Sequence, residues 1–99
     1  MKQELFWTHL ASTQLANLHA FIAEDNPSAA DRQAEIVVSA VDRLVDFPEK
    51  GRRGRRRGTR ELVVPGTPYI VAYRLRLSVI EILAVIHGKR RWPRSFKDE

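Results

Sequence analysis

The sequence predicts an α+β fold in which an N-terminal helical hairpin packs on a four-stranded antiparallel sheet. Two observations predict it: apolar residues recur at helical spacing in the first half of the chain, and short apolar runs separated by turn signals fill the second half. We expect the 99 residues to form one domain, 1–99. Its expected segments are a strand at 1–8, the helical hairpin at 9–47, a basic loop at 48–60, a β-meander at 61–87 and a basic tail at 88–99.

The chain opens with a short aromatic run, Glu4-Leu5-Phe6-Trp7, which is typical of a strand. We expect this strand to pair with an edge of the sheet. Thr8 or Ser12 can then cap a helix, because a hydroxyl accepts a hydrogen bond from a free N–H of the first turn. One face of that helix is apolar and consists of Ala11, Leu15, Leu18 and Ile22.

A second helix is predicted after a break at Asp25-Asn26-Pro27. Asn26 suits the N-cap, and Pro27 suits the first helical position, where a missing N–H costs nothing. Phe47-Pro48 is expected to end this helix. Its apolar side consists of Ala34, Val37, Val38, Val41, Leu44 and Val45.

The second half is predicted to be the β-meander. Its strand-like apolar runs are residues 61–64, 69–75 and 79–85. Pro65-Gly66 fits the centre of a type II turn, since glycine allows positive φ, and Leu77-Ser78 is the expected reversal before the last strand. That strand is nearly all apolar, which favours a central strand buried on both faces, with Glu81 as a costly exception. We expect the helices on one face of the sheet, leaving the other face free for binding.

Composition excludes several classes of site. With 43% apolar and 29% charged residues, the chain is typical of a folded globular protein. It has no cysteine, which excludes disulfides, thiolate zinc sites and cysteine nucleophiles. Its three histidines lack ligand spacing, so we expect neither a metal nor a cofactor. No apolar run is long enough for a membrane span and no secretory signal opens the chain, so a cytoplasmic protein is expected.

The net charge of +5 is unevenly distributed. Residues 1–49 hold three basic and eight acidic side chains, whereas residues 50–99 hold fourteen basic and four acidic ones. Seven of the eleven residues at 50–60 are basic, and arginine forks can bind phosphates in pairs. We expect the glycines to keep this loop mobile, and a merely solubilising loop is the alternative to a binding loop. Target or nucleic-acid binding is predicted for Arg52, Arg53, Arg55, Arg56, Arg57 and Arg60.

Several motifs follow one another in a fixed order. Asp25-Asn26-Pro27-Ser28-Ala29-Ala30 lies at the helix junction, and Phe47-Pro48 precedes the basic loop. The longest motif is Gly58-Thr59-Arg60-Glu61-Leu62-Val63-Val64-Pro65-Gly66-Thr67-Pro68-Tyr69-Ile70-Val71-Ala72-Tyr73-Arg74. After it come Ile80-Glu81-Ile82-Leu83 and His87-Gly88-Lys89-Arg90-Arg91-Trp92-Pro93. Over about residues 3–93, this series resembles the RelE/ParE toxin superfamily of type II toxin–antitoxin systems.

The resemblance implies the same fold, two helices on an antiparallel sheet. It also implies a partner, an antitoxin with an acidic neutralising segment that forms a hetero-oligomer with the toxin. RelE-like members cut mRNA in the ribosomal A site, whereas ParE-like members inhibit DNA gyrase and are not nucleases. We favour a ParE-like gyrase inhibitor. A ribosome-dependent mRNA interferase is the alternative, and a relative that binds without poisoning is the third reading.

The nuclease alternative depends on Arg60 and His87. Arg60 stands at the start of a strand, where RelE-like nucleases place an arginine that steadies the scissile phosphate. His87 can act as general acid or base, and a hydrogen-bonded structural histidine is its alternative. Arg74 can join Arg60 on one sheet face if the register permits. The alternative is that these arginines form ion pairs with Glu61 or Glu81.

Further candidates for target or nucleic-acid contact lie outside the basic loop. They are Arg74 in the β-meander and Lys89, Arg90, Arg91 and Trp92 in the basic tail. Many mRNA-cutting relatives have a tyrosine in this segment, whereas Trp92 can stack on a base but cannot exchange a proton. We favour a packing role for Trp92-Pro93, which would pin the tail onto the sheet. Tyr69 and Tyr73 are also interpreted as packed rather than catalytic.

Overall fold

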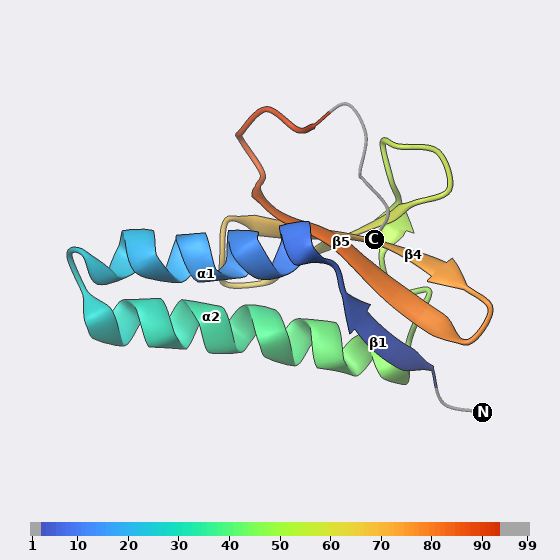
Figure 1. Ribbon diagram of the computed structural model, residues 1–99, viewed down its shortest axis with the longest axis horizontal. Helices are drawn as coiled ribbons and strands as arrows, with labels where there is room; N and C mark the ends of the chain where they lie inside the picture. Colours follow the sequence, from blue (N-terminus) through green and yellow to red (C-terminus); the bar gives the residue numbers. More distant parts are fainter. Residues whose placement is uncertain (1–2, 94–99) are drawn as a thin grey trace.

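The computed structural model describes residues 3–93, which form a helical hairpin and a five-stranded sheet (Figure 1). The elements are β1 (Glu4–Trp7), α1 (His9–Ala23), α2 (Pro27–Asp42), the 3₁₀ helix η1 (Arg43–Val45), β2 (Arg52–Arg53), β3 (Arg60–Val63), β4 (Tyr69–Arg76) and β5 (Val79–His87). The strand order is β1-β5-β4-β3-β2. The predicted α+β class, with a helical hairpin packed on the sheet, is confirmed.

The sheet differs from the prediction because it has five strands rather than four and is mixed rather than antiparallel. β1 lies parallel to β5, with Leu5 opposite Ile80. Parallel pairing needs a long crossover instead of a tight turn, and the helices and three further strands supply it here. β2 lies inside the predicted loop and pairs with β3, with Arg52 opposite Glu61. Its two arginines carry no apolar pattern that would have predicted a strand.

Both helices begin at predicted caps. Thr8 Oγ1 accepts a hydrogen bond from the backbone N–H of Ala11 at 3.2 Å. Asn26 Oδ1 accepts one from the third residue after it at 3.0 Å, and Pro27 is the first residue of α2. α2 ends at Asp42, earlier than the predicted end at Phe47-Pro48, because the chain tightens into η1. No helix in the described part of the chain is long and apolar enough to cross a membrane.

The two predicted reversals in the sheet are confirmed. At Pro65-Gly66, the backbone N–H of Thr67 donates to Val64 O at 3.2 Å and the φ of Gly66 is +81°, as a type II turn requires. Leu77-Ser78 joins β4 to β5. β5 lies between β1 and β4, so it is a central strand, as its apolar run predicted.

The sheet is covered on both faces, contrary to the expectation of one free face. The main core joins the helices to the sheet, and its largest fully buried side chains include Leu44, Tyr73, Ile80 and Ile82. A smaller cluster on the other face consists of Ile70, Ala72, Leu83, Ala84, Ile86 and Trp92. Trp92 is only 7% exposed, which confirms its predicted packing role. The central strands are apolar on both faces. The helices cover one face, and Trp92 of the tail covers part of the other.

Candidate functional site: the arginine loop and the tail

The base of the arginine loop (residues 50–60) is held by Tyr73 and Arg60. The hydroxyl of Tyr73 donates to Pro48 O and accepts from the backbone N–H of Gly51, each at 2.8 Å. Burial raises the pKa of this hydroxyl, so Tyr73 stays protonated and structural. The Arg60 guanidinium donates to Gly51 O at 2.8 Å and to Glu49 O at 3.2 Å. Arg60 therefore uses Nη1 to hold the base of the loop.

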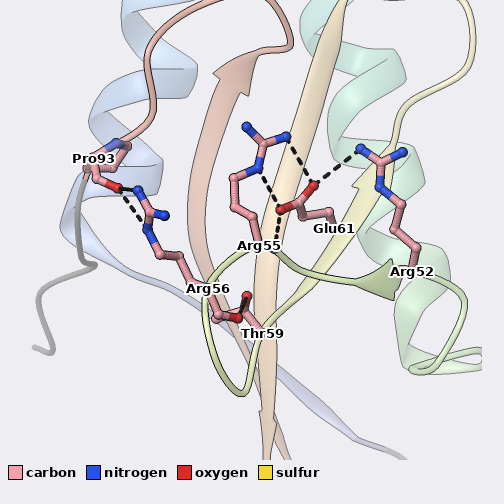
Figure 2. Close-up of polar contacts among 6 residues, drawn as sticks. All are labelled: Arg52, Arg55, Arg56, Thr59, Glu61 and Pro93. Atoms are coloured by element: carbon pink, nitrogen blue, oxygen red, sulfur yellow. Dashed lines mark hydrogen bonds and ion pairs between the residues drawn. The ribbon is translucent and has the colours of Figure 1, made fainter.

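Glu61 of β3 directly follows the loop, and loop arginines surround its carboxylate (Figure 2). The residue is only 3% exposed. Its carboxylate accepts from the backbone N–H and the Nε of Arg55 at 2.8 and 3.0 Å, and from Arg52 Nη2 at 3.2 Å. Burial alone raises the pKa of Glu61, but the hydrogen bonds from Arg55 and Arg52 outweigh it and hold the pKa below its ordinary value of 4.5. Two of the predicted binding arginines thus serve to neutralise a buried carboxylate.

The other side of the loop is attached to the tail (residues 88–93). The Arg55 guanidinium lies over the Trp92 ring, 3.8 Å from its centroid. Arg56 donates to the Pro93 carbonyl through Nε at 3.0 Å and again through Nη2 (Figure 2). Figure 1 shows both segments projecting on the same side of the molecule. Loop and tail therefore form one connected surface.

Two glycines of the loop, Gly51 and Gly54, lie where the chain packs closely. A Cβ on Gly51 would lie 2.6 Å from the Tyr73 hydroxyl, and one on Gly54 would lie 2.2 Å from Thr59 Oγ1. The backbone N–H of Gly54 also donates to Thr59 O at 2.8 Å. These glycines allow close packing of the loop, so its arginines are presented from a folded hairpin.

Two loop arginines face outward. Within residues 3–93, the side chains of Arg53 and Arg57 make no hydrogen bond or ion pair. They line a hollow of about 650 Å³, the arginine hollow, together with the rest of residues 53–60 and with Leu75 of β4. Their guanidinium groups can bind phosphate or carboxylate there. Arg53 and Arg57 are therefore arginines of the hollow that are available to a ligand.

Arg74 does not join Arg60 on one sheet face. Arg60 lies opposite Tyr73, so Arg74, the next residue along β4, points to the other face. Arg74 instead forms an ion pair with Glu81, and Arg76 approaches the same carboxylate at 3.4 Å. The predicted alternative, an ion pair with Glu81, is confirmed for Arg74. These ion pairs offset the free-energy cost of placing the charged carboxylate of Glu81 in an apolar central strand.

His87 lies in a second hollow, of about 600 Å³, between α1, the end of β5 and the tail. Its ring meets the edge of Tyr69 with centroids 5.8 Å apart, and its Nδ1 accepts from the backbone N–H of Lys89 at 3.1 Å. The side chains around it include Phe21, Arg90 and Arg91. Within residues 3–93, no group of three potential metal ligands is present.

The structure does not bring Arg60 and His87 together. Arg60 of β3 lies opposite Tyr73 of β4, whereas His87 of β5 lies opposite Tyr69 on the other side of β4. Along the strand direction, the four residues from Tyr69 to Tyr73 separate Arg60 from His87 by about 13 Å. Across the sheet, the two residues are also two strands apart, at about 4.8 Å per strand. The two side chains line different hollows.

Comparison with known proteins agrees with this architecture. Residues 5–92 match the sequence model of a family described as "ParE toxin of type II toxin-antitoxin system, parDE". The chain belongs to this ParE toxin family. A Sinorhizobium fredii protein named "Putative toxin Y4kP" is 41% identical over 92 residues, which are 93% of this chain and 95% of that protein.

A further relative and a solved structure are also similar to this ParE-family toxin. "Toxin RelE2" of Caulobacter vibrioides is 30% identical over 87 residues, which cover 88% of this chain and 97% of the relative. A solved structure described as "Chromosomal ParDE TA system from P. aeruginosa" has the same fold, with a TM-score of 0.77 and 24% identity. That match covers 86% of this chain and 95% of the other.

Sequence reasoning missed some features of the ParE-family toxin's surface. Glu61 was considered a possible partner of Arg60, whereas it organises Arg52 and Arg55. A signal was available, since Glu61 is the one acidic residue between Lys50 and residue 80. Exposed Leu75 and Leu77 were also missed, although a Leu-Ser pair is unusual in a two-residue hairpin turn.

Proposed function

We propose that this ParE-family toxin is a non-enzymatic inhibitor of DNA gyrase. The observation that carries the proposal is the separation of Arg60 from His87. Cleavage of a phosphodiester needs a proton-transfer group within hydrogen-bond reach of the same phosphate that the stabilising cation contacts. The Nη1 of Arg60 donates to the carbonyls of Glu49 and Gly51, and His87 is not near this group. The surface is thus better suited to binding a target than to cutting RNA.

The cations that remain available define where the target docks. Arg53 and Arg57 line the arginine hollow. Arg90 and Arg91 of the tail line the hollow that contains His87. The loop–tail contacts hold these two groups on one connected surface. Acidic side chains of gyrase, or phosphates of the DNA bound to it, supply the complementary charge.

An antitoxin with an acidic segment is the proposed partner that silences the toxin. The same arginine hollow attracts its carboxylates, and a helix or strand of the partner can cover the adjoining surface. Electrostatic attraction of this kind weakens as ionic strength rises. The toxin is then active only when its cationic surface is uncovered.

A ribosome-dependent mRNA interferase is the second candidate. It is favoured by the 30% identity to the toxin named RelE2 and by the position of His87, which lines a hollow together with Arg90 and Arg91. In that reading His87 exchanges protons, while the nearby arginines support the phosphate.

Growth arrest in cells that express the chain without an antitoxin distinguishes the two candidates. We expect filamentation, a DNA-damage response and intact mRNA, together with inhibition of supercoiling by purified gyrase. Rapid cleavage of translated mRNA without DNA damage would instead establish the interferase.

The binding surface is tested in the same cells with the double variant Arg53→Ser/Arg57→Ser. We expect it to lose growth arrest and to bind the antitoxin at least tenfold more weakly, because it removes two available cations of the arginine hollow. The matched control is Arg32→Ser/Arg43→Ser, which removes the same charge from exposed positions outside the loop. Equal toxicity of the two double variants would contradict the proposed surface.

A further inference from the structure

The turn between β4 and β5 has an unusual residue at its tip. Leu77 has φ +49° and is the only non-glycine residue with positive φ among residues 3–93. Arg76 pairs with Val79, so Leu77 and Ser78 form a two-residue hairpin turn. When the first central residue of such a turn has a positive φ, it is normally glycine, asparagine or aspartate. A bulky residue in this conformation has a strained backbone.

No packing within the described chain compensates for this strain. The Leu77 side chain is fully exposed, with a relative exposure of 101%. Glycine or asparagine would satisfy the turn geometry without placing an apolar side chain in water. Backbone strain that folding does not need is a known mark of binding sites.

The strained leucine directly follows β4, a strand that contributes one residue to the arginine hollow. Leu75, two residues before it, is 37% exposed and lines that hollow together with Arg53 and Arg57. An apolar tip is thus placed next to available cations. Protein–protein interfaces have this arrangement, because a few buried apolar anchors are surrounded by a charged or polar rim.

We propose that Leu77, supported by Leu75, is an anchor that inserts into an apolar pocket on the protein target, while Arg53 and Arg57 meet acidic groups around that pocket. The inference rests on the proposed function in that it takes the target to be a protein. An aliphatic side chain contributes nothing to phosphate binding, and the apolar surface spans two leucines. A protein pocket therefore fits this tip better than a nucleic-acid backbone does.

Leu77→Gly and Leu77→Asn test the anchor without endangering the fold. Both residues accept positive φ, so their Tm is expected to equal or exceed that of the wild type. We expect the concentration needed to inhibit gyrase supercoiling to rise roughly 30-fold, which is typical of losing an interface hot spot. Leu77→Met keeps an apolar side chain and is expected to stay within about threefold of the wild type.

Three outcomes would overturn the anchor. The first is full inhibition by Leu77→Gly. The second is a Leu77→Gly variant that arrests growth normally but binds the antitoxin more weakly, since the tip would then belong to the antitoxin interface. The third is a parallel loss of affinity for a short duplex DNA, which would make Leu77 a wedge between bases.

Failure of the proposed function gives a different result. If the wild-type toxin leaves gyrase active, the gyrase proposal fails, and growth arrest by the same variants still tests the anchor. Arrest that survives Leu77→Gly overturns the anchor, whereas arrest that is lost in Leu77→Gly and kept in Leu77→Met supports it.

Discussion

At the scale of single residues, Glu61 determines the shape of the arginine loop. A carboxylate that is only 3% exposed is stable because Arg55 and Arg52 supply charge-assisted hydrogen bonds. Removing Arg55 or Arg52 would leave the buried carboxylate with less compensation for its charge. The conformation that presents Arg53 and Arg57 therefore depends on a buried carboxylate between their neighbours in the loop.

The lowered pKa of Glu61 predicts loss of stability in acid. Because its pKa is lower in the folded state than the ordinary value of 4.5, its contribution is fully present above that value and is lost as pH falls through the folded pKa. Chemical unfolding measured from pH 7 to pH 3 is expected to show this loss. Glu61→Gln should be less stable at pH 7 by about 1–3 kcal/mol and should lose less stability in acid.

The control for this measurement is Glu35→Gln, which changes an exposed carboxylate on α2. It is expected to keep the acid dependence of the wild type. If Glu61→Gln showed the same acid dependence as Glu35→Gln, the buried carboxylate would not be the titrating group.

At the scale of elements, the loop and the tail stabilise each other. Trp92 covers the outer face of the sheet and at the same time receives the Arg55 guanidinium. A cation over an indole ring contributes about 0.5–1 kcal/mol at an exposed site, in addition to the burial of the ring. A change in the tail should therefore be transmitted to the loop.

Trp92→Ala is expected to lower the free energy of unfolding by about 3 kcal/mol, because it removes most of the cover over a buried apolar cluster. Hydrogen exchange at the backbone N–H of Arg55, which is bonded to Glu61, should accelerate. Trp92→Phe keeps a ring over the sheet and serves as the control. Unchanged exchange at Arg55 in the alanine variant would show that the loop holds its shape without the tail.

Elements that depend on local chemistry could be predicted from the sequence. Thr8 and Asn26 cap the helices as expected, and Pro65-Gly66 makes its turn, because each signal acts within four residues. The parallel pairing of β1 could not be predicted, since no local signal connects it to β5.

Site geometry was less predictable because it depends on register. A shift of one residue in the pairing of β3 with β4 would move Arg60 to the opposite face. The bulge at Leu83, between the pairs Ala72–Ala84 and Tyr73–Ile82, likewise changes which side chains of β5 face the helices. No pattern in the sequence located that bulge.

At the scale of the whole molecule, Thr8 joins three parts of the fold. Its hydroxyl donates to Ile82 O at 2.9 Å and accepts from the first turn of α1, while its backbone N–H donates to Ile82 O at 3.1 Å. The residue is only 2% exposed. One side chain thus connects β1, the helical hairpin and the central strand.

Thr8→Val keeps the volume of the side chain but removes the hydrogen bonds of the hydroxyl to Ile82 O, to Leu83 O and from the N–H of Ala11. We expect a loss of about 1–2 kcal/mol and a decrease in Tm of roughly 4–8 °C per kcal/mol, measured by calorimetry. Thr8→Ser retains the hydroxyl and should lose less than half as much. Equal losses in the two variants would mean that the methyl group, not the hydrogen bonds, stabilises this junction.

The pairing of β1 with β5 also has a consequence for the synthesis of the protein. Thr8 and Ile82 are 74 residues apart, so β1 has no strand to pair with until β5 has left the ribosome. Such distant contacts form late and slow the completion of folding. The sheet of the nascent polypeptide therefore lacks its first edge strand for most of translation, and the native fold is completed only after β5 has emerged.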